Sequence, residues 1–255
     1  MTSVLILGCT GGATHGLRST ALLVNQETLI DCGSGAGDLT LEEMAAVQQI
    51  FLTHSHLDHI MLLPLLADAT LPARSKPLMV YALPETLQVL RQHLFNGVLW
   101  PDYTTQPNPA APYIQLTPIS LGETVTLSGC RYTALPARHS IPAVGYWLDA
   151  GSGSLVFSGD SADCPEFWKA ANAIGNLRYV MVETTMRDED AAVAEHSGHT
   201  TPQQLARGVA RLQRPAELLV THIEPHKRDA VHAQVRAALG GRAVHFVERG
   251  EVYRL

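Results

Sequence analysis

The sequence is poor in charged residues, and what charge it has is slightly acidic. Charged residues make up 16% of the 255 positions, and the formal net charge is −6 with the histidines neutral. A protein that binds duplex nucleic acid usually carries a basic stripe, so bulk charge gives no reason to expect one here. A local positive site for a small anion is still compatible with this balance.

Cysteines and long apolar runs are also scarce. The four cysteines lie far apart, with no Cys-x-x-Cys spacing, which predicts a reduced protein whose thiols are core residues. The first residues, MTSVLILG, have no basic n-region and no long apolar h-region, so no signal peptide is expected. No apolar run reaches the roughly 18 residues that a membrane span needs. These absences predict a cytoplasmic protein that does not enter a membrane.

Short β-rich segments alternate with helical patterns along the chain. Capping boxes at 40–43 and 201–204 begin two helices, and two further helices are expected over 161–174 and 226–241. The expected strands are short, β-branched or aromatic, and bounded by Gly, Pro, Asp or Ser. They cover residues 3–8, 20–24, 28–31, 49–53, 78–82, 124–128, 131–137, 144–149, 154–158, 179–183, 218–222, 243–247 and 251–255. This alternation indicates a layered α/β protein.

One segment, at about 93–115, follows neither pattern. It is rich in Pro and Asn, yet it holds Trp100, Tyr103 and Tyr113. We expect it to form an ordered loop or lid.

Residues 51–60, FLTHSHLDHI, concentrate His54, His56, Asp58 and His59 after an apolar run. Buried imidazoles each need a hydrogen-bond partner, so three so close together would be costly as core packing. Neutral imidazoles and a carboxylate are good ligands for a borderline divalent metal such as Zn²⁺. Because the run follows a strand, it is expected at the carboxyl end of that strand, where α/β sheets usually build their sites.

Several other expected strands also end in candidate ligands. A single Asp at a strand end is about as often a turn residue, but the group as a whole indicates one convergent metal site. Its members are Asp31, His139, Asp160, Glu183 and His222.

The ordered series of these residues resembles the metallo-β-lactamase superfamily over nearly the whole chain. The resemblance implies one domain, 1–255, with a four-layer αββα sandwich, and two divalent metal ions. Zn²⁺ is the expected metal, with Mn²⁺ or iron as alternatives. The resemblance further implies that Asp31 orients a ligand without binding metal and that Asp160 bridges the two ions. One ion would be held by His54, His56 and His139, and the other by Asp58, His59 and His222.

Two further segments resemble particular branches of the superfamily. Residues 183–206 are similar to the segment, Glu followed by GH(L/M)TP, of class II cyclic-nucleotide phosphodiesterases and of ribonuclease Z. Residues 93–104 look like the H-x-F-N … W-P-D segment of bacterial relatives of the phosphodiesterases, whereas residues 61–64 depart from the Ala/Gly-containing continuation of that class. In phosphodiesterases of the superfamily, the carboxylate at the position of Asp58 is an oxygen ligand of the second metal.

The residues of the segment 183–206 also support a catalytic role for His199. It comes just before a helix start, where free N–H groups and the helix dipole favour a phosphate. His199 would protonate the leaving oxygen, and Glu183 would hold its tautomer. The alternative is that His199 only caps or packs beside the helix.

The sequence therefore predicts a dinuclear phosphodiesterase that converts cAMP or cGMP to the 5′-monophosphate, with Trp100 or Tyr103 stacking on the base. Three alternatives remain: a cyclic dinucleotide phosphodiesterase, a ribonuclease Z-like tRNA 3′-processing endonuclease, and a non-catalytic nucleotide-binding protein. The expected partner is a small nucleotide rather than a nucleic acid. A homodimer is implied by the resemblance alone, and His15, Arg18 and Arg138 have no assigned role.

Overall fold

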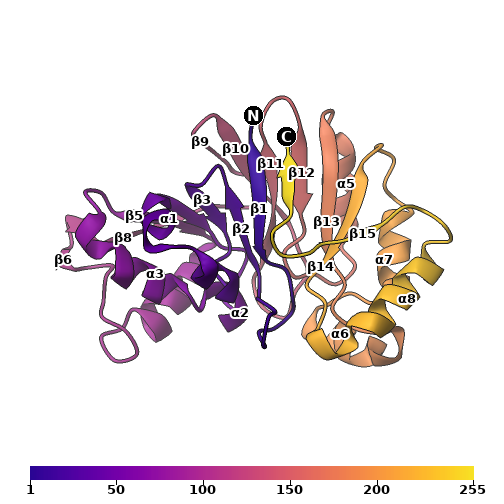
Figure 1. Ribbon diagram of the computed structural model, residues 1–255, viewed down its shortest axis with the longest axis horizontal. Helices are drawn as coiled ribbons and strands as arrows, with labels where there is room; N and C mark the ends of the chain where they lie inside the picture. Colours follow the sequence, from indigo (N-terminus) through magenta and orange to yellow (C-terminus); the bar gives the residue numbers. More distant parts are fainter.

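The computed structural model describes residues 1–255, and most of its strands form two seven-stranded sheets that face each other (Figure 1). The order in the first sheet is β16 (Val252–Arg254), β1 (Ser3–Gly8), β2 (Ala21–Val24), β3 (Thr28–Ile30), β4 (Gln49–Phe51), β5 (Leu78–Ala82) and β8 (Ile114–Pro118). The order in the second sheet is β15 (His245–Phe246), β14 (Glu217–Thr221), β13 (Leu177–Glu183), β12 (Ser154–Phe157), β11 (Val144–Asp149), β10 (Cys130–Pro136) and β9 (Thr124–Leu127). A separate two-stranded ribbon joins β6 (Pro107–Asn108) to β7 (Ala111–Pro112).

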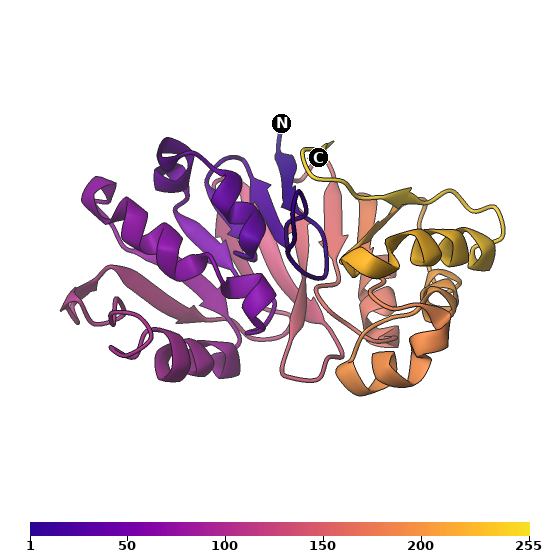
Figure 2. The same cartoon turned by 60° about the horizontal axis from the view of Figure 1, so that its bottom comes forward.

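In each sheet the pairing changes from antiparallel to parallel part-way across. Strands β3, β4, β5 and β8 pair in parallel in the first sheet, and β12, β13, β14 and β15 do so in the second. Because the carboxyl ends of parallel strands meet at one edge of a sheet, the residues that follow these strands come together there. This is the lower edge of the sandwich in Figure 1, which Figure 2 turns toward the viewer.

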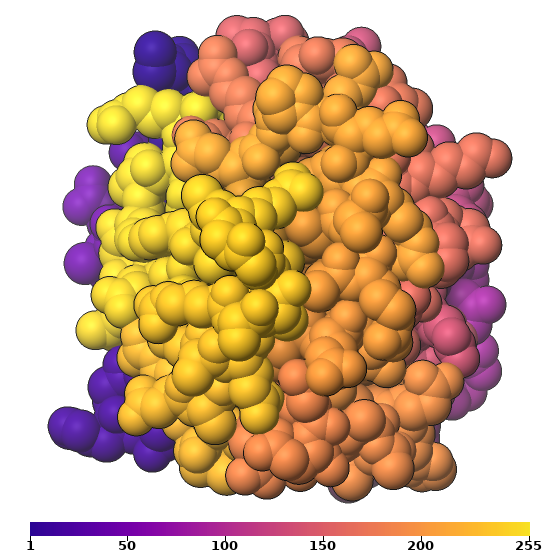
Figure 3. Space-filling model, turned by 90° about the vertical axis from the view of Figure 1, so that its right-hand side faces the viewer, coloured from indigo at the N-terminus to yellow at the C-terminus, as the bar shows by residue number.

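Helices cover the outer faces of both sheets. The first half of the chain contributes α1 (Leu41–Ala46), α2 (Leu57–Ile60), α3 (Leu63–Thr70) and α4 (Pro84–Val89), and the second half contributes α5 (Pro165–Ala173), α6 (Ala191–Ser197), α7 (Pro202–Val209) and α8 (Arg228–Ala238). From the side of α7 and α8, the surface is formed mainly by the orange and yellow residues of the second half (Figure 3). No helix combines the length and apolar character that crossing a membrane requires.

Buried apolar side chains form three layers that match this arrangement. Between the sheets, the ring of Phe51 stacks on Tyr81 and on Tyr132, with centroids 4.7 and 4.5 Å apart. A second cluster joins the first sheet to α3 and α4, and a third joins the second sheet to α5, α7 and α8. Apolar faces on both sides of each sheet are therefore covered, which confirms the four-layer αββα sandwich.

All the expected strands and helices occur in the structure, but one helix starts later than expected and several elements were not expected. All the expected strands occur, with ends within two residues of the prediction. The helix expected from residue 161 begins only at Pro165, because Pro is favoured in the first helical turn and residues 161–164 form the turn after β12. Helices α2 and α6 and the ribbon of β6 and β7 were not expected. Strand β8 and helices α3 and α4 were not expected either. The prolines at or near their ends hid them, since Pro reads as a break in a regular pattern.

The segment 93–115 packs along the helix-covered face of the first sheet, and this overturns one prediction. Tyr103 is 5% exposed, its hydroxyl donates a hydrogen bond to Asp68 of α3, and its ring meets Tyr113 edge-on with centroids 5.6 Å apart. A side chain held in this way cannot stack on a base, so the stacking role predicted for Tyr103 is wrong. Trp100 is half-buried against the same cluster, and its stacking role stays a prediction.

Candidate metal centre

The HSHLDH motif turns sharply as it leaves β4. His54 lies in the extended segment after the strand, and the four-residue helix α2 begins directly after His56. In extended chain, alternate side chains point to one side, so His54 and His56 face the same way. The single turn of α2 then places the side chains of Asp58 and His59 beside those of His54 and His56.

The remaining ligands arrive from strand ends of the second sheet. His139 follows β10, Asp160 follows β12 through Gly159, and His222 directly follows β14. The backbone at His222 has φ +58°, and the backbone at Asp31, after β3, has φ +59°. This left-handed conformation costs a residue other than glycine about 1–3 kcal/mol. At both strand ends it turns a side chain into the site.

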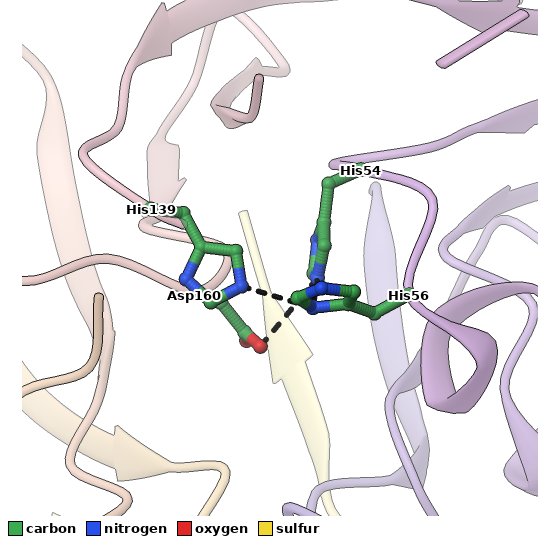
Figure 4. Close-up of side chains that lie close together, drawn as sticks. All are labelled: His54, His56, His139 and Asp160. Atoms are coloured by element: carbon green, nitrogen blue, oxygen red, sulfur yellow. Dashed lines mark hydrogen bonds and ion pairs between the residues drawn. The ribbon is translucent and has the colours of Figure 1, made fainter. Parts of the chain in front are cut away.

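The first ligand group is formed by His54, His56, His139 and Asp160, whose ligand atoms all lie within 4.8 Å of one another (Figure 4). The Nε2 atoms of His54 and His139 each lie 3.0 Å from Nδ1 of His56. One ring nitrogen has a single proton or a single lone pair, so it cannot satisfy both neighbours. Tetrahedral ligands about 2.0–2.1 Å from a Zn²⁺ ion would be separated by roughly 3.3 Å, close to this spacing.

The second group is formed by Asp58, His59, Asp160 and His222. Nε2 of His222 lies 3.1 Å from Nε2 of His59 and 3.2 Å from Oδ2 of Asp58. Asp160 belongs to both groups, with Oδ2 3.3 Å from Nε2 of His59 and 3.7 Å from Nε2 of His54. The structure thus brings together all seven side chains that the sequence grouped.

The chemistry of these donors fits divalent cations. Asp160 is buried, and its Oδ1 has no hydrogen-bond partner, although an unpaired polar atom in a protein interior is costly. A cation shared by the two groups would satisfy this oxygen. Imidazole and carboxylate donors suit Zn²⁺, Mn²⁺ or iron. The seven residues therefore form a cluster that can bind metal ions.

The protonation of most ligands also favours metal binding, with His59 as the exception. Burial lowers the pKa of His59, but the carboxylates of Asp160 and Asp31 outweigh it and raise this pKa well above its usual value, so a metal ion must displace a proton there. Burial lowers the pKa of His54, His56 and His139, which keeps them in the neutral form that binds metal. Burial raises the pKa of Asp58, but the neighbouring imidazoles of His222 and His59 outweigh it and lower this pKa to about 2. Asp58 is therefore ionised near neutral pH. Most of the ligands already have the form that binding requires.

Asp31 lies behind the second ligand group and is fully buried. Its Oδ2 is 2.7 Å from Nδ1 of His59, and its Oδ1 accepts a hydrogen bond from the backbone N–H of Thr53 at 2.8 Å. The bond to Nδ1 leaves Nε2 of His59 to face the other ligands. This is the orienting contact that the resemblance implies for Asp31.

His199 and Glu183 form an ion pair beside both ligand groups. Nδ1 of His199 lies 2.9 Å from Oε1 of Glu183, and the ring of His199 lies 4.9 Å from that of His139 and 5.7 Å from that of His222. Burial lowers the pKa of His199, but Glu183 outweighs it and raises this pKa to about 9. His199 is therefore protonated near neutral pH.

The structure excludes one part of the alternative interpretation of His199, that it caps the helix. Helix α7 is capped by Thr201 and Gln204, which form a capping box. His199 therefore does not cap the helix. Its side chain keeps 13% exposure, so it remains reachable from solvent.

Several residues singled out in the sequence lie apart from the cluster. His15 is exposed in the loop after β1, Arg18 pairs with Asp38 at 3.0 Å, and Arg138 pairs with Glu195 at 2.8 Å. The two arginines that the sequence left without a role thus form ion pairs with surface carboxylates.

The sequence analysis missed Gly198, whose carbonyl oxygen lies 2.9 Å from Nδ1 of His139. Its φ is +74°, and a Cβ atom there would lie 2.7 Å from Cα of His139. The conformation and the close approach both require glycine. A glycine just before His199 was the available signal, but its contact with His139 joins residues 59 positions apart.

Gly198→Ala is expected to weaken metal binding by the first group about 10–100-fold, as losses of a ligand's supporting contact usually do. The new methyl group would collide with His139 and displace its ring from the other ligands of the first group. Zn²⁺ titration of the metal-free protein against a chromophoric chelator measures the effect. Gly175→Ala is the matched control, since nothing lies within 4 Å of a Cβ there. Equal affinities for the two variants would contradict the role of Gly198.

Comparison with known proteins agrees with this fold. Residues 27–223 match the family described as the beta-lactamase superfamily domain. The 3′,5′-cyclic-nucleotide phosphodiesterase 1 of Saccharomyces cerevisiae is 35% identical over 68 residues, which cover 26% of this chain and 18% of that enzyme. The ribonuclease Z of Methanosarcina acetivorans is 24% identical over 289 aligned positions, covering 91% of this chain and 90% of that enzyme. The crystal structure of unliganded yeast PDE1 superposes with a TM-score of 0.81 at 18% identity, covering 98% of both chains.

An αββα sandwich with histidines and aspartates clustered at one edge defines the class of this protein. The chain belongs to the metallo-β-lactamase superfamily. Its relatives include both branches that the sequence indicated, the cyclic-nucleotide phosphodiesterases and the ribonuclease Z enzymes.

Proposed function

We propose that this protein is a dinuclear metal-dependent phosphodiesterase that opens 3′,5′-cyclic nucleotides to 5′-monophosphates. The observation that carries the proposal is the His199–Glu183 pair, at 2.9 Å, beside two ligand groups that share Asp160. A protein that only bound a nucleotide would need neither shared metal ligands nor a proton donor. The name of the yeast relative, a 3′,5′-cyclic-nucleotide phosphodiesterase, supports the substrate class.

Each residue of the site has a separate task in this reaction. Divalent ions, held by the seven ligands, would lower the pKa of the attacking water and offset the charge of the phosphate. Glu183 accepts the Nδ1–H of His199, which leaves the other ring N–H to act as donor. His199 gives this proton to the departing 3′-oxygen, a step worth about 10²–10⁴-fold. Glu183 then holds the neutral ring in place until it is reprotonated.

A second candidate is a ribonuclease Z-like endonuclease. The observation that favours it is the length of the match, which covers 91% of this chain and 90% of the enzyme from Methanosarcina acetivorans. The net charge of −6 speaks against a tRNA substrate, because phosphate contacts from basic residues dominate the affinity for nucleic acids. A cyclic dinucleotide is a third possible substrate, since the same groups would cleave its diester bonds.

A substrate panel tests the proposal directly. Zn²⁺- and Mn²⁺-loaded protein is assayed with cAMP, cGMP, a cyclic dinucleotide and a precursor tRNA. We expect hydrolysis of a cyclic mononucleotide, with the 5′-monophosphate as the product, because the 3′-oxygen is the leaving group. Efficient cleavage of only the dinucleotide or the tRNA would overturn the substrate assignment and leave the metal ligands standing.

A further inference from the structure

One histidine of each ligand group has a threonine hydroxyl behind it. Oγ1 of Thr53 lies 2.9 Å from Nδ1 of His54 in the first group. Oγ1 of Thr185 lies 3.1 Å from Nδ1 of His222 in the second group. Both threonines are buried, with 0% and 2% exposure. The two histidines are buried as well, with 0% exposure for His54 and 3% for His222.

Each of these hydroxyls also meets a buried carboxylate. Oγ1 of Thr53 lies 2.9 Å from Oδ2 of Asp31, and Oγ1 of Thr185 lies 2.8 Å from Oε2 of Glu183. A carboxylate can only accept hydrogen bonds, and a hydroxyl has one proton to donate. The proton of each hydroxyl therefore goes to the carboxylate, and the oxygen accepts from the histidine.

This direction of hydrogen bonding decides the form of each ring. With Nδ1–H donated to the threonine, the lone pair lies on Nε2, the atom that faces the other ligands. We propose that Thr53 and Thr185 are positioning residues that select the metal-binding tautomers of His54 and His222, one for each group. The inference needs the two ligand groups but not the cyclic-nucleotide substrate.

The two threonines differ in one respect that an experiment can use. Oγ1 of Thr185 also lies 3.2 Å from Nδ1 of His199, whereas Thr53 has no contact with the His199–Glu183 pair. Loss of the Thr185 hydroxyl thus affects both a metal ligand and the proton donor. Loss of the Thr53 hydroxyl affects the ligands alone.

The test compares Thr53→Val and Thr185→Val, which keep the shape but lose the hydroxyl, with Thr53→Ser and Thr185→Ser, which keep the hydroxyl. Zn²⁺ affinity is measured by titrating the metal-free proteins against a chromophoric chelator. We expect each Val variant to bind the Zn²⁺ ion of the ligand group that its threonine supports about 10–100-fold less tightly. The Ser variants should remain close to the parent.

The matched control is Thr70→Val. Thr70 is also fully buried, and its hydroxyl donates to the backbone carbonyl of Leu66 in α3 at 2.8 Å. This variant loses a comparable buried hydrogen bond but should bind Zn²⁺ as the parent does. If all three Val variants lost thermal stability and none lost Zn²⁺ affinity, the threonines would be structural only and the proposal would fail.

A second measurement uses the unaltered protein and so does not depend on how the variants fold. Nitrogen-15 NMR of Zn²⁺-loaded protein distinguishes histidines protonated at Nδ1 from those protonated at Nε2. We expect His54 and His222 to carry their proton on Nδ1. A proton on Nε2 of either ring would overturn the assignment for that threonine, whatever substrate the protein hydrolyses.

Discussion

Asp160→Asn is expected to lower kcat for phosphodiester hydrolysis on the order of 10³-fold or more. Asp160 is the only residue common to both ligand groups, and its buried Oδ1 has no hydrogen-bond partner. The amide keeps the shape of the side chain but loses the negative charge that a shared cation needs. The loss of several kcal/mol of charge stabilisation accounts for a decrease of this size.

Bound metal and kcat should fall together in this variant. Elemental analysis of purified protein gives the metal content, and hydrolysis of bis(p-nitrophenyl) phosphate gives the rate. Asp163→Asn is the control, because Asp163 is a nearby aspartate in an ion pair with Arg211 outside the cluster. Full activity with unchanged metal content in Asp160→Asn would exclude a shared metal ligand at this position.

His199→Ala is expected to lower kcat for a cyclic nucleotide about 10²–10⁴-fold while metal content stays unchanged. The departing 3′-oxygen is a poor leaving group and needs the proton that His199 holds. A nitrophenolate leaves without a proton, so the loss for bis(p-nitrophenyl) phosphate should be much smaller. The ratio of the two losses therefore measures proton donation separately from metal chemistry.

His196→Ala serves as the control for this prediction. His196 is exposed on α6 and has no contact with the pair of His199 and Glu183. Its removal should leave both rates unchanged. Equal losses on the two substrates for His199→Ala would show that His199 positions the phosphate instead of donating a proton.

The sequence by itself indicated the alternation of strands and helices and the candidate ligands, because both depend on signals carried by short segments. Short β-branched or aromatic runs bounded by Gly, Pro, Asp or Ser mark the strands, and capping boxes such as Thr40 with Glu43 mark helix starts. The four ligands of the HSHLDH run lie within six consecutive residues, so short-range structure alone brings them together. The more distant ligands, Asp160 and His222, followed recognisable strands whose ends meet at one edge of the sandwich.

The burial of Tyr103 was decided by tertiary structure. An aromatic residue in a Pro-rich segment has the same local signal whether it covers a site or fills a core. Helix α3 lies alongside and supplies Asp68 as the partner of the hydroxyl. The free energy gained by burying the ring against this helix outweighs any local preference.

The hydrogen bonds behind the ligands were also decided by tertiary structure. Thr53 and Asp31 lie 22 positions apart, and Thr185 and His222 lie 37 apart. A hydrogen bond requires its atoms to be within a few tenths of an ångström of about 3 Å, whereas sequence periodicity specifies only which side of a strand a residue occupies. The sequence by itself thus determined which residues gather at the edge of the sandwich. Only the packing of the two sheets decided which hydroxyl meets which imidazole, because the positions of the strand ends, set by the whole core, fix distances at that scale.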